Sequence, residues 1–420
     1  MKKIARGLSM VLSAGVFCLL GLTVYAYMAL PDSFTAIQGE TLVLPSGLPV
    51  QICLEQGTRP AYIPVWENTQ QPKSARQATP PVTASLKLFN RILVKDVSVQ
   101  TVSRKMVVPC GNPFGIKMFT DGVMIVGMSD IQIGSSSVNP SKQAGLKIGD
   151  LLVSINGEPV MRNEDVAQII AQSAGQEVRV AVLRGGEKLE VGLTPVQTEY
   201  DHVYRAGVWV RDSSAGIGTM TYFDPETLGF AGLGHAICDV DTGKIMPLSS
   251  GEIVAVNVTG INAGQSGKPG ELRGAFVNEN AVGSLLENTE LGIFGRLHFP
   301  CVSAEPIPMA VKQEVQPGAA QIYATISGSR PQGFDVVIEK VNYSDNAQSK
   351  NMVVHVVDEG LLSATGGIVQ GMSGSPIVQE GKLVGAVTHV FVNDPTRGYA
   401  VFSENMDKIL NNVEKNKKAA

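Results

Sequence analysis

Apolar positions along the chain form one long uninterrupted run, followed by many short runs that alternate with polar residues. Residues 7–31 contain no charged side chain, and Lys2, Lys3 and Arg6 precede them. As a helix, such a run is about long enough to cross a bilayer once, and the preceding positive charges favour a cytoplasmic N-terminus. The pattern therefore predicts a signal anchor, with the bulk of the chain outside the cytoplasm. Cleavage near Ala26-Tyr27-Met28-Ala29, as in a signal peptide, is the alternative.

The remaining pattern predicts three regions. Residues 32–106 contain short strand-like runs and a stretch rich in Pro, Gln and Ala over 60–82, which we interpret as a linker. In residues 107–196, strand-like runs surround a helix pattern that starts at Asn163, a favourable N-cap residue. Residues 197–420 are Gly-rich, and their turns recur at intervals that suit a barrel or a sandwich.

Composition narrows the class of function. The chain has 420 residues, enough for two or more domains, and its 45 glycines and 6% aromatic residues favour β structure with many turns. The net charge is −4 and no large basic block is present, so we expect no nucleic-acid partner. The five cysteines have no metal-ligand spacing, and we expect no metal or other cofactor. One or two disulfides are compatible with export, and buried free thiols are the alternative.

The region 107–196 contains the run Ala144-Gly145-Leu146-Lys147-Ile148-Gly149-Asp150, followed by Ile155-Asn156-Gly157. These segments resemble the PDZ domains attached to bacterial extracytoplasmic peptidases. The resemblance implies that a peptide C-terminus adds as a strand beside Ile116-Lys117-Met118. Its carboxylate would be held by the backbone N–H groups of Phe114, Gly115 and Ile116. The alternative is a module that serves only as a spacer or lid.

The segment Gly371-Met372-Ser373-Gly374-Ser375-Pro376 carries the most specific chemistry. A serine between glycines on a tight turn exposes its hydroxyl and directs backbone N–H groups toward one point, and an acyl-transfer nucleophile needs both. We therefore predict Ser373 as the nucleophile and the N–H groups of Gly371 and Ser373 as the oxyanion hole. The residue order resembles the nucleophile loop of chymotrypsin-like serine peptidases. Ser375, which fits a packing role, and Ser266 are weaker candidates.

His235 is the best candidate for the general base. It follows the turn Gly232-Leu233-Gly234 and precedes a small residue, so its ring can approach a nucleophile without obstruction. The third member should be an aspartate that orients the imidazole. Asp358 gives the order His–Asp–Ser and lies 15 positions before Ser373, although it could instead cap the turn that follows it. Asp239, Asp241 and Asp335 are the alternatives.

The apolar N-terminus, the PDZ-like region, the His235 segment and residues 365–376 and 385–396 together resemble the SpoIVB peptidase family of spore-forming bacteria. The resemblance implies a serine endopeptidase, anchored or secreted, between the mother-cell and forespore membranes. It implies self-cleavage near the N-terminus and cleavage of a membrane-bound regulator of an intramembrane metallopeptidase, which releases a sigma factor. It assigns catalysis to Ser373, His235 and Asp358. The PDZ domain would govern self-association or target choice.

We therefore predict a mainly β chain with four parts. These are a signal anchor over 1–31, strands and a Pro-rich linker over 32–106, a PDZ domain over 107–196 and a chymotrypsin-like serine peptidase domain over 197–420. The last would be a variant of its fold, because an aspartate so close to the serine departs from the usual spacing. Self-cleavage is expected in or just before 54–82. The alternatives are a catalytically silent, membrane-anchored PDZ scaffold that binds peptide C-termini and a general quality-control protease of the cell envelope.

Overall fold

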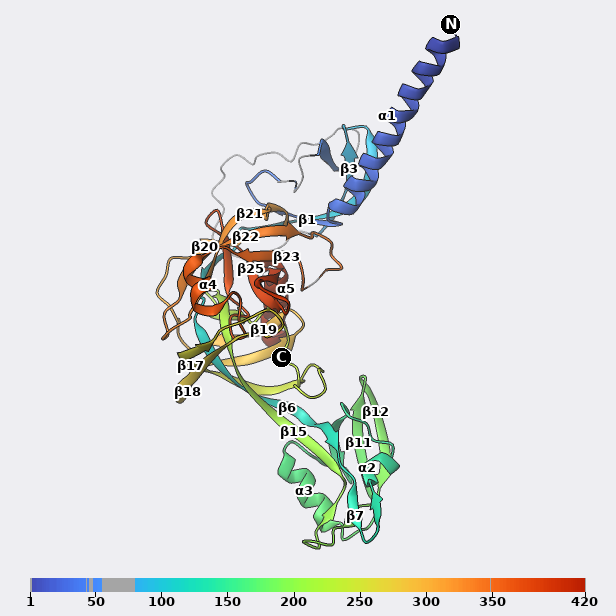
Figure 1. Cartoon of the computed structure of the whole chain (residues 1–420), viewed down its shortest axis with the longest axis vertical. Coiled ribbons are helices and arrows are strands. Elements are labelled where there is room, and N and C mark those ends of the chain that lie inside the picture. The colour runs from blue at the N-terminus through green and yellow to red at the C-terminus, as the bar shows by residue number, and fades with distance from the viewer. Residues whose placement is uncertain (1, 43, 45–47, 55–79, 348, 420) are drawn as a thin grey trace.

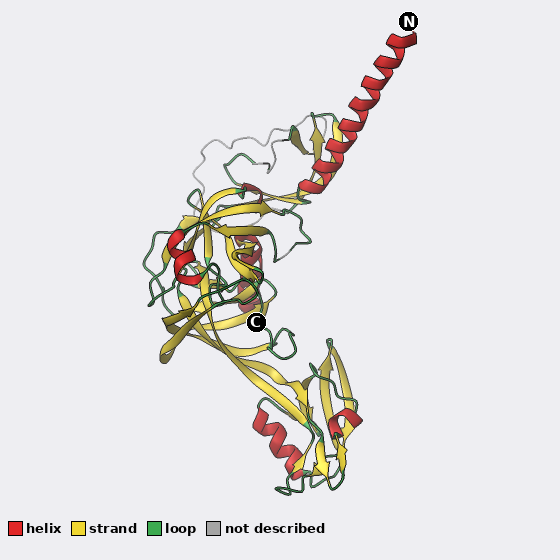
Figure 2. Ribbon diagram, viewed as in Figure 1, coloured by secondary structure: helices red, strands yellow, loops and turns green. Residues whose placement is uncertain are grey.

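The structure is a computed structural model of the whole chain, and it describes all residues except 1, 43, 45–47, 55–79, 348 and 420. The described chain is mainly β, as predicted (Figure 2). Helix α1 (Lys2–Ala29) extends away from the rest of the molecule (Figure 1). Its segment Ser9–Ala29 is long and apolar enough to cross a membrane. This agrees with the predicted N-terminal helix, whether it is an anchor or a signal sequence.

A small sheet follows α1. Its strands lie in the order β1 (Ser33–Ile37), β4 (Ile92–Val102), β3 (Val82–Leu88) and β2 (Val50–Leu54), and β1 runs parallel to β4. Leu86 and Leu88 are fully buried in its core, which Ala26 and Leu30 from the end of the helix region complete. Most of the predicted linker lies outside the described residues.

The PDZ-like lobe lies at the opposite end of the molecule from α1 (Figure 1). Its sheet consists of β12 (Glu187–Leu193), β11 (Val178–Arg184), β9 (Leu151–Ile155) and the end of β6 (Pro113–Met128). Val166 and Ile170 of helix α3 (Asn163–Gln172) pack into a core with Ile125 and Val180. The lobe also contains α2 (Pro140–Gln143) and the short strands β7 (Ile131–Ile133), β8 (Ser136–Val138) and β10 (Glu158–Pro159).

Two long strands connect this lobe to the peptidase region. Strand β6 pairs antiparallel with β15 (Val208–Phe223) from Val208 opposite Met128 to Thr219 opposite Pro113. The first half of β6 also pairs with β17 (Leu248–Asn262), which belongs to the peptidase region. The predicted boundary at residue 107 is therefore displaced, because residues 113–120 pair within the peptidase sheet and the PDZ-like pairing of β6 starts at Val123.

Six strands of the peptidase region close into a first barrel. Strand β17 pairs with β18 (Glu271–Thr289), and the pairing continues through β19 (Gly292–Leu297), β16 (Gly229–Gly232) and β15. The pairings of β6 with both β15 and β17 complete the ring. The enclosed core contains the buried side chains of Phe114, Ile116, Phe230, Ile253 and Ile293. Strands β5 (Met106–Pro109) and β20 (Ile307–Pro308) extend this sheet beyond β15.

A second closed barrel follows. It consists of β21 (Gly318–Ala324), β22 (Gln332–Val341), β23 (Met352–Val356), β26 (Asp394–Phe402), β25 (Lys382–Phe391) and β24 (Pro376–Gln379). Helix α4 (Glu359–Thr365) lies between β23 and β24, and α5 (Ser403–Ala419) packs Met406 and Leu410 against side chains of both barrels. The short strands β13 (Val196–Gln197) and β14 (Tyr204–Arg205) and the turn η1 (Lys312–Glu314) complete the described elements. Two adjoining six-stranded barrels agree with the predicted chymotrypsin-like peptidase domain.

Candidate active site

The predicted nucleophile lies where the two barrels meet. We call residues 366–375, between α4 and β24, the serine loop. The loop belongs to the second barrel by sequence, and the fully buried side chain of Met372 anchors it in that core. Strand β15 of the first barrel holds its other side, because Thr219 N–H donates to the Ser373 carbonyl at 3.0 Å and Thr221 Oγ1 donates to the Gly374 carbonyl at 2.8 Å.

Position 374 of the serine loop requires a glycine for two reasons, which are its backbone conformation and the lack of room for a side chain. Gly374 has a φ of +96°, a region that other residues rarely adopt. A Cβ atom at this position would lie 2.0 Å from the Thr219 carbonyl oxygen and 2.5 Å from the Leu233 nitrogen. The absence of a side chain therefore lets the loop lie directly against the first barrel.

The loop leaves two N–H groups without an acceptor. The N–H groups of Met372, Gly374 and Ser375 donate to the carbonyls of Val369, Val387 and Met372, at 3.1, 2.7 and 2.9 Å. Those of Gly371 and Ser373 donate to no group within the described part of the chain. These are the two N–H groups that the sequence predicted as oxyanion donors. An unpaired pair of donors next to a serine hydroxyl is the arrangement that stabilises an oxyanion.

The two serine hydroxyls of the loop have different environments. The Ser373 hydroxyl is partly exposed and donates to the Thr388 carbonyl at 2.7 Å. The Ser375 side chain is fully buried, and its hydroxyl has no partner among the described residues. Ser375 therefore packs inside the protein, as predicted, and only Ser373 presents an accessible oxygen. Ser266 donates to the Asn393 carbonyl at 2.8 Å.

His235 lies next to β25, the strand that also carries the Thr388 carbonyl bonded to Ser373. We call residues 233–247, between β16 and β17, the histidine loop. Its first turn lies against β25, because a Cβ atom on Gly234 would lie 2.8 Å from Thr388 Cγ2. The His235 ring lies 4.9 Å from the ring of His389, measured between centroids. Ser373 and His235 are thus both placed at Thr388 and His389, although no hydrogen bond joins them among the described residues.

The hydrogen bonding of His235 sets which nitrogen can act as a base. Its Nδ1 lies 2.9 Å from the Ala236 carbonyl oxygen, which can only accept, so Nδ1 carries the proton of the neutral ring. Nε2 is then the basic nitrogen. Burial lowers the pKa of His235 below 6.5, and the bond to Ala236 opposes this in part. Burial, followed by the charges of His235 and Lys350, lowers the pKa of His389 to about 4.

The predicted aspartate has another role in this structure. Asp358 caps α4, with Oδ1 accepting from Leu361 N–H at 2.9 Å and Oδ2 accepting from Asp335 N–H at 3.3 Å. Within the described chain, no hydrogen bond or ion pair joins His235 to Asp358, Asp335, Asp239 or Asp241. Sequence reasoning missed the Ala236 carbonyl as the partner of the ring, and it did not place the His389 ring beside His235.

The predicted peptide-binding residues lie elsewhere than expected. Phe114, Gly115 and Ile116 are in the first half of β6, inside the first barrel, with β15 on one side and β17 on the other. Phe114 and Ile116 are 2% and 4% exposed. Their strand is paired on both edges, so the prediction that their N–H groups hold a peptide carboxylate is wrong.

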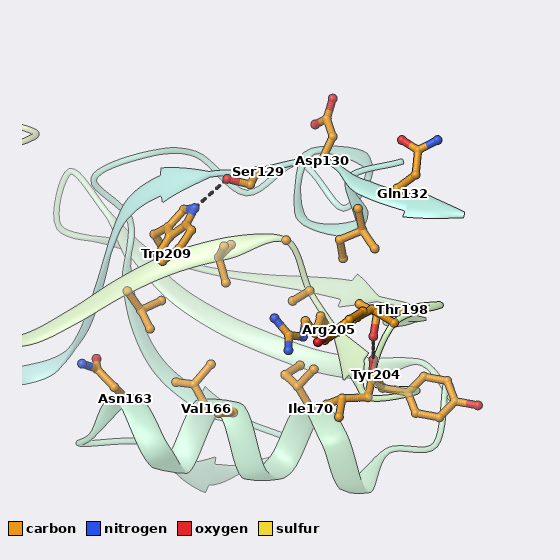
Figure 3. Close-up of a pocket in the computed structure, with 18 of the residues that line it drawn as sticks. Ser129, Asp130, Gln132, Asn163, Val166, Ile170, Thr198, Tyr204, Arg205 and Trp209 are labelled. Atoms are coloured by element: carbon orange, nitrogen blue, oxygen red, sulfur yellow. Dashed lines mark hydrogen bonds between the residues drawn. The ribbon is translucent and has the colours of Figure 1, made fainter. Parts of the chain in front are cut away.

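A different surface of the PDZ-like lobe is hollow. A cavity of about 710 Å³ lies between α3 and the start of β15 (Figure 3). Val166 and Ile170 supply apolar lining, and Trp209 Nε1 donates to Ser129 Oγ at 2.6 Å at its edge. In the described chain, the segment 208–210 pairs with β6 alone, so its second edge is open. Asn163 Oδ1, at the start of α3, is buried without a partner among the described residues.

Known proteins resemble the chain in two regions. Residues 202–407 match the family model described as SpoIVB peptidase S55, and residues 136–184 match the PDZ domain model. A DegP-like periplasmic serine endoprotease of Pseudomonas putida is 24% identical over 159 residues, which is 36% of this chain and 30% of the relative. Serine protease HTRA1 of Xenopus tropicalis is 34% identical over 61 residues, 14% of this chain and 13% of the relative. The chain thus spans less than a third of the length of these curated relatives.

Solved structures match at low scores. The HtrA-type protease AlgW with a decapeptide has a TM-score of 0.29 and 10% identity, over 49% of this chain and 55% of that one. The PDZ domain of an SdrC-like protein from Listeria monocytogenes has a TM-score of 0.18 and 16% identity, over 21% of this chain and 87% of that one. The two family matches contain both predicted motifs, so the chain carries a SpoIVB peptidase S55 domain over residues 202–407 and a PDZ domain over residues 136–184.

Proposed function

We propose that the chain is a serine endopeptidase, with Ser373 as nucleophile and His235 as general base. The observation that carries this proposal is the serine loop, which combines an accessible hydroxyl on Ser373 with the N–H groups of Gly371 and Ser373, neither of which has an acceptor among the described residues. The match to a peptidase family model supports it. Among the described residues, no group of three His, Cys, Asp or Glu side chains could hold a metal ion.

The geometry supports the following reaction. The Ser373 hydroxyl leaves the Thr388 carbonyl, transfers its proton to His235 Nε2 and attacks the peptide carbonyl carbon. The carbonyl oxygen becomes an oxyanion that accepts from the N–H groups of Gly371 and Ser373. The His235 imidazolium then protonates the leaving amine, which breaks the peptide bond. A water molecule, deprotonated by His235, releases the acyl group from Ser373.

A fluorophosphonate probe tests the nucleophile directly. We expect the full chain in detergent to be labelled at Ser373, and we expect Ser373→Ala to abolish both labelling and self-cleavage. Ser375→Ala is the matched control in the same loop, because that hydroxyl is buried and should be dispensable. Equal labelling of the parent and Ser373→Ala would disprove the assignment.

Asp358 is retained as the proposed third member, on the resemblance alone. Its catalytic role and its capping role can be separated, because Asn and Ser also cap helices but carry no charge. If the charge acts on His235, Asp358→Asn should reduce kcat at least about 100-fold with the melting temperature nearly unchanged. If Asp358 only caps α4, Asp358→Asn should keep its activity, and Asp358→Ala should lose about 1 kcal/mol of stability.

Substrate and place of action are proposed from the family resemblance. We propose that the peptidase domain acts outside the cytoplasm on itself and on a membrane-bound regulator of an intramembrane metallopeptidase during sporulation. The apolar α1 and the periplasmic relative support the location. Peptide C-termini are proposed to bind the PDZ-like lobe in the cavity between α3 and β15, where an open strand edge faces apolar side chains.

A second candidate function is a catalytically silent PDZ scaffold. It is favoured by the bond from Ser373 Oγ to the Thr388 carbonyl and by the lack of a carboxylate at His235 among the described residues. The scaffold and the enzyme differ in the labelling experiment, because a scaffold would leave the probe unreacted. Peptide binding by the PDZ-like lobe would be common to both.

A further inference from the structure

Two cysteines that are distant in the sequence meet in the first barrel. The Sγ atoms of Cys110 and Cys301 lie 3.8 Å apart, although 191 positions separate the residues. Cys110 is 3% exposed and lies between β5 and β6, and Cys301 is half-buried in the segment between β19 and β20. Among the described residues, the contacts of the Cys53 and Cys238 thiols are with Asn90 and the Ala236 carbonyl, and not with another cysteine. We propose that Cys110 and Cys301 form a disulfide in the exported protein.

The surroundings of the two thiols suit bond formation. A disulfide needs the Sγ atoms at about 2.05 Å, so they must approach by less than about 2 Å, which side-chain rotation can supply. The backbone at Cys110 is fixed, because its N–H donates to the Thr221 carbonyl at 2.9 Å. Cys301 lies outside the strand ladders and can adjust, and its Sγ already contacts Met220 Sδ at 3.5 Å.

The two thiols differ in reactivity. The hydrogen bond from Cys110 lowers the pKa of the Cys301 thiol, whereas burial raises the pKa of Cys110. Cys301 is also the more exposed of the two, so we expect its thiolate to attack the disulfide of a small-molecule oxidant or of a thiol–disulfide oxidoreductase. The Cys110 sulfur then loses its proton and displaces the oxidant's second sulfur from Cys301. The two cysteines together lose two protons and two electrons, which convert the oxidant's disulfide into two thiols.

The bond would stabilise the strand that holds the serine loop. Residues 110–112 follow β15 closely, since Gly111 N–H donates to the Met220 carbonyl at 2.9 Å and Met220 N–H donates to the Asn112 carbonyl at 3.0 Å. On either side of Met220, Thr219 and Thr221 hold the serine loop. A disulfide between Cys110 and Cys301 would therefore hold in place the part of β15 to which the serine loop, with the proposed nucleophile, is hydrogen-bonded.

The test measures thiols and needs no catalytic activity, so it is independent of the proposed enzyme function. The full chain in detergent, as Ser373→Ala to prevent self-cleavage, is incubated with oxidised glutathione, alkylated under denaturing conditions and digested. We expect one peptide pair that joins Cys110 to Cys301, and alkylation of the other three cysteines. The melting temperature of the oxidised chain should exceed that of the reduced chain by about 5–10 °C.

Matched variants assign the bond to these two cysteines. Cys301→Ser, at a half-buried position, and Cys110→Ala, which keeps the core site apolar, should each abolish the linked peptide and the rise in melting temperature. Cys238→Ser, at an exposed position, should retain both. Five alkylated cysteines after oxidation, a linked peptide that contains Cys53 or Cys238, or a rise in melting temperature that survives in Cys301→Ser would each overturn the proposal.

Discussion

At the scale of the single residue, the His235 ring is hydrogen-bonded to a backbone carbonyl and lies against a second imidazole ring. The bond to the Ala236 carbonyl fixes the Nδ1–H tautomer, and the His389 ring lies beside it. Burial is the main cause of the lowered pKa of His235. In most copies of the protein the ring is therefore neutral at neutral pH and able to accept a proton. His389, with a pKa of about 4, is already neutral in this range and does not titrate with it.

We therefore expect the acid side of the pH–rate profile to report His235 alone. Activity should fall as the pH decreases, because protonated His235 cannot act as a base, and the midpoint should lie below 6.5. His389→Asn removes the covering ring, so the midpoint should move up toward 6.5. The measurement is kcat/KM against pH with a quenched-fluorescence peptide, and His202→Asn in the other lobe serves as control. A midpoint above 6.5 in the parent, or one unchanged in His389→Asn, would contradict this prediction.

The local features of the candidate site that could be predicted from the sequence are those set by a short turn. The glycines beside Ser373 set the local conformation, so the free N–H groups of Gly371 and Ser373 were predictable from a few neighbouring residues. The Thr388 carbonyl and the His389 ring contact the site through strand β25, across gaps in the sequence that no local pattern describes. The contacts of Asp358 show the same limit, because a capping aspartate and a catalytic one have similar local sequences.

Strands β6 and β15 show, at the scale of the element, why the PDZ prediction was partly wrong. Strand β6 is continuous over 16 residues, and its sequence does not show that its two halves pair with different parts of the molecule. The resemblance assigned the whole strand to the PDZ domain, whereas residues 114–119 pair with β17 of the first barrel. Strand β15 therefore extends without a break from the cavity of the PDZ-like lobe to the serine loop, which its Thr219 contacts.

Arg211 on β15 connects this element to the histidine loop. Its guanidinium donates to the carboxylate of Asp239, which is 1% exposed, and to Asp241 Oδ2 at 2.8 Å. Lys244 of the same loop donates to the Gly149 carbonyl of the PDZ-like lobe at 3.0 Å. Arg211→Gln would leave the buried Asp239 without its main cationic partner, at a cost of about 1–3 kcal/mol. Because Asp239 is four positions after His235, we expect kcat to fall by about tenfold or more with little change in KM.

A steady-state comparison of three variants checks this prediction. Lys188→Gln is the control, because Lys188 of β12 is 62% exposed, lies 4.0 Å from Glu190 and should be close to neutral. Arg211→Gln combined with Asp239→Asn removes both the cation and the buried charge, so part of the lost activity should return. Equal activities of the Arg211 and Lys188 variants would show that the histidine loop is positioned without this ion pair.

At the scale of the whole molecule, the N-terminal sheet packs directly against the peptidase region. Strand β1 contacts η1, and Thr35 Oγ1 of β1 donates to Glu404 Oε1 of α5 at 2.6 Å. Near it, Arg104 donates to Glu314 and to Glu40, and Lys382 of β25 donates to Glu314 Oε1 at 2.6 Å. These contacts join residues more than 60 positions apart, so neither the closure of the barrels nor this docking could be predicted from periodicity.

We call the ion pairs of Glu314 with Arg104 and Lys382 the Glu314 cluster. This cluster should make the free energy of unfolding depend on pH in the acid range. Burial alone would raise the pKa of Glu314, but hydrogen bonds from Arg104, Lys382 and the Val311 N–H outweigh it and lower the pKa to about 2. The folded-state pKa lies below the unfolded value of 4.5, so the stabilisation is complete above pH 4.5 and is lost as the pH falls from about 4.5 to about 2. The difference between these two pKa values corresponds to about 3 kcal/mol.

We expect the urea midpoint of the Ser373→Ala chain to decrease between pH 4.5 and pH 3, and Glu314→Gln to remove much of this dependence. The variant should also be less stable at pH 7, because Arg104 then loses its largely buried anionic partner Glu314 and retains the more exposed Glu40. Glu190→Gln is the control, since its side chain is 58% exposed and lies 4.0 Å from Lys188. If Glu314→Gln and Glu190→Gln followed the parent equally across this range, the cluster would not be the source of the acid sensitivity. If only the Glu314 variant lost the dependence while its N-terminal sheet became sensitive to added protease, the cluster would be what holds that sheet on the second barrel.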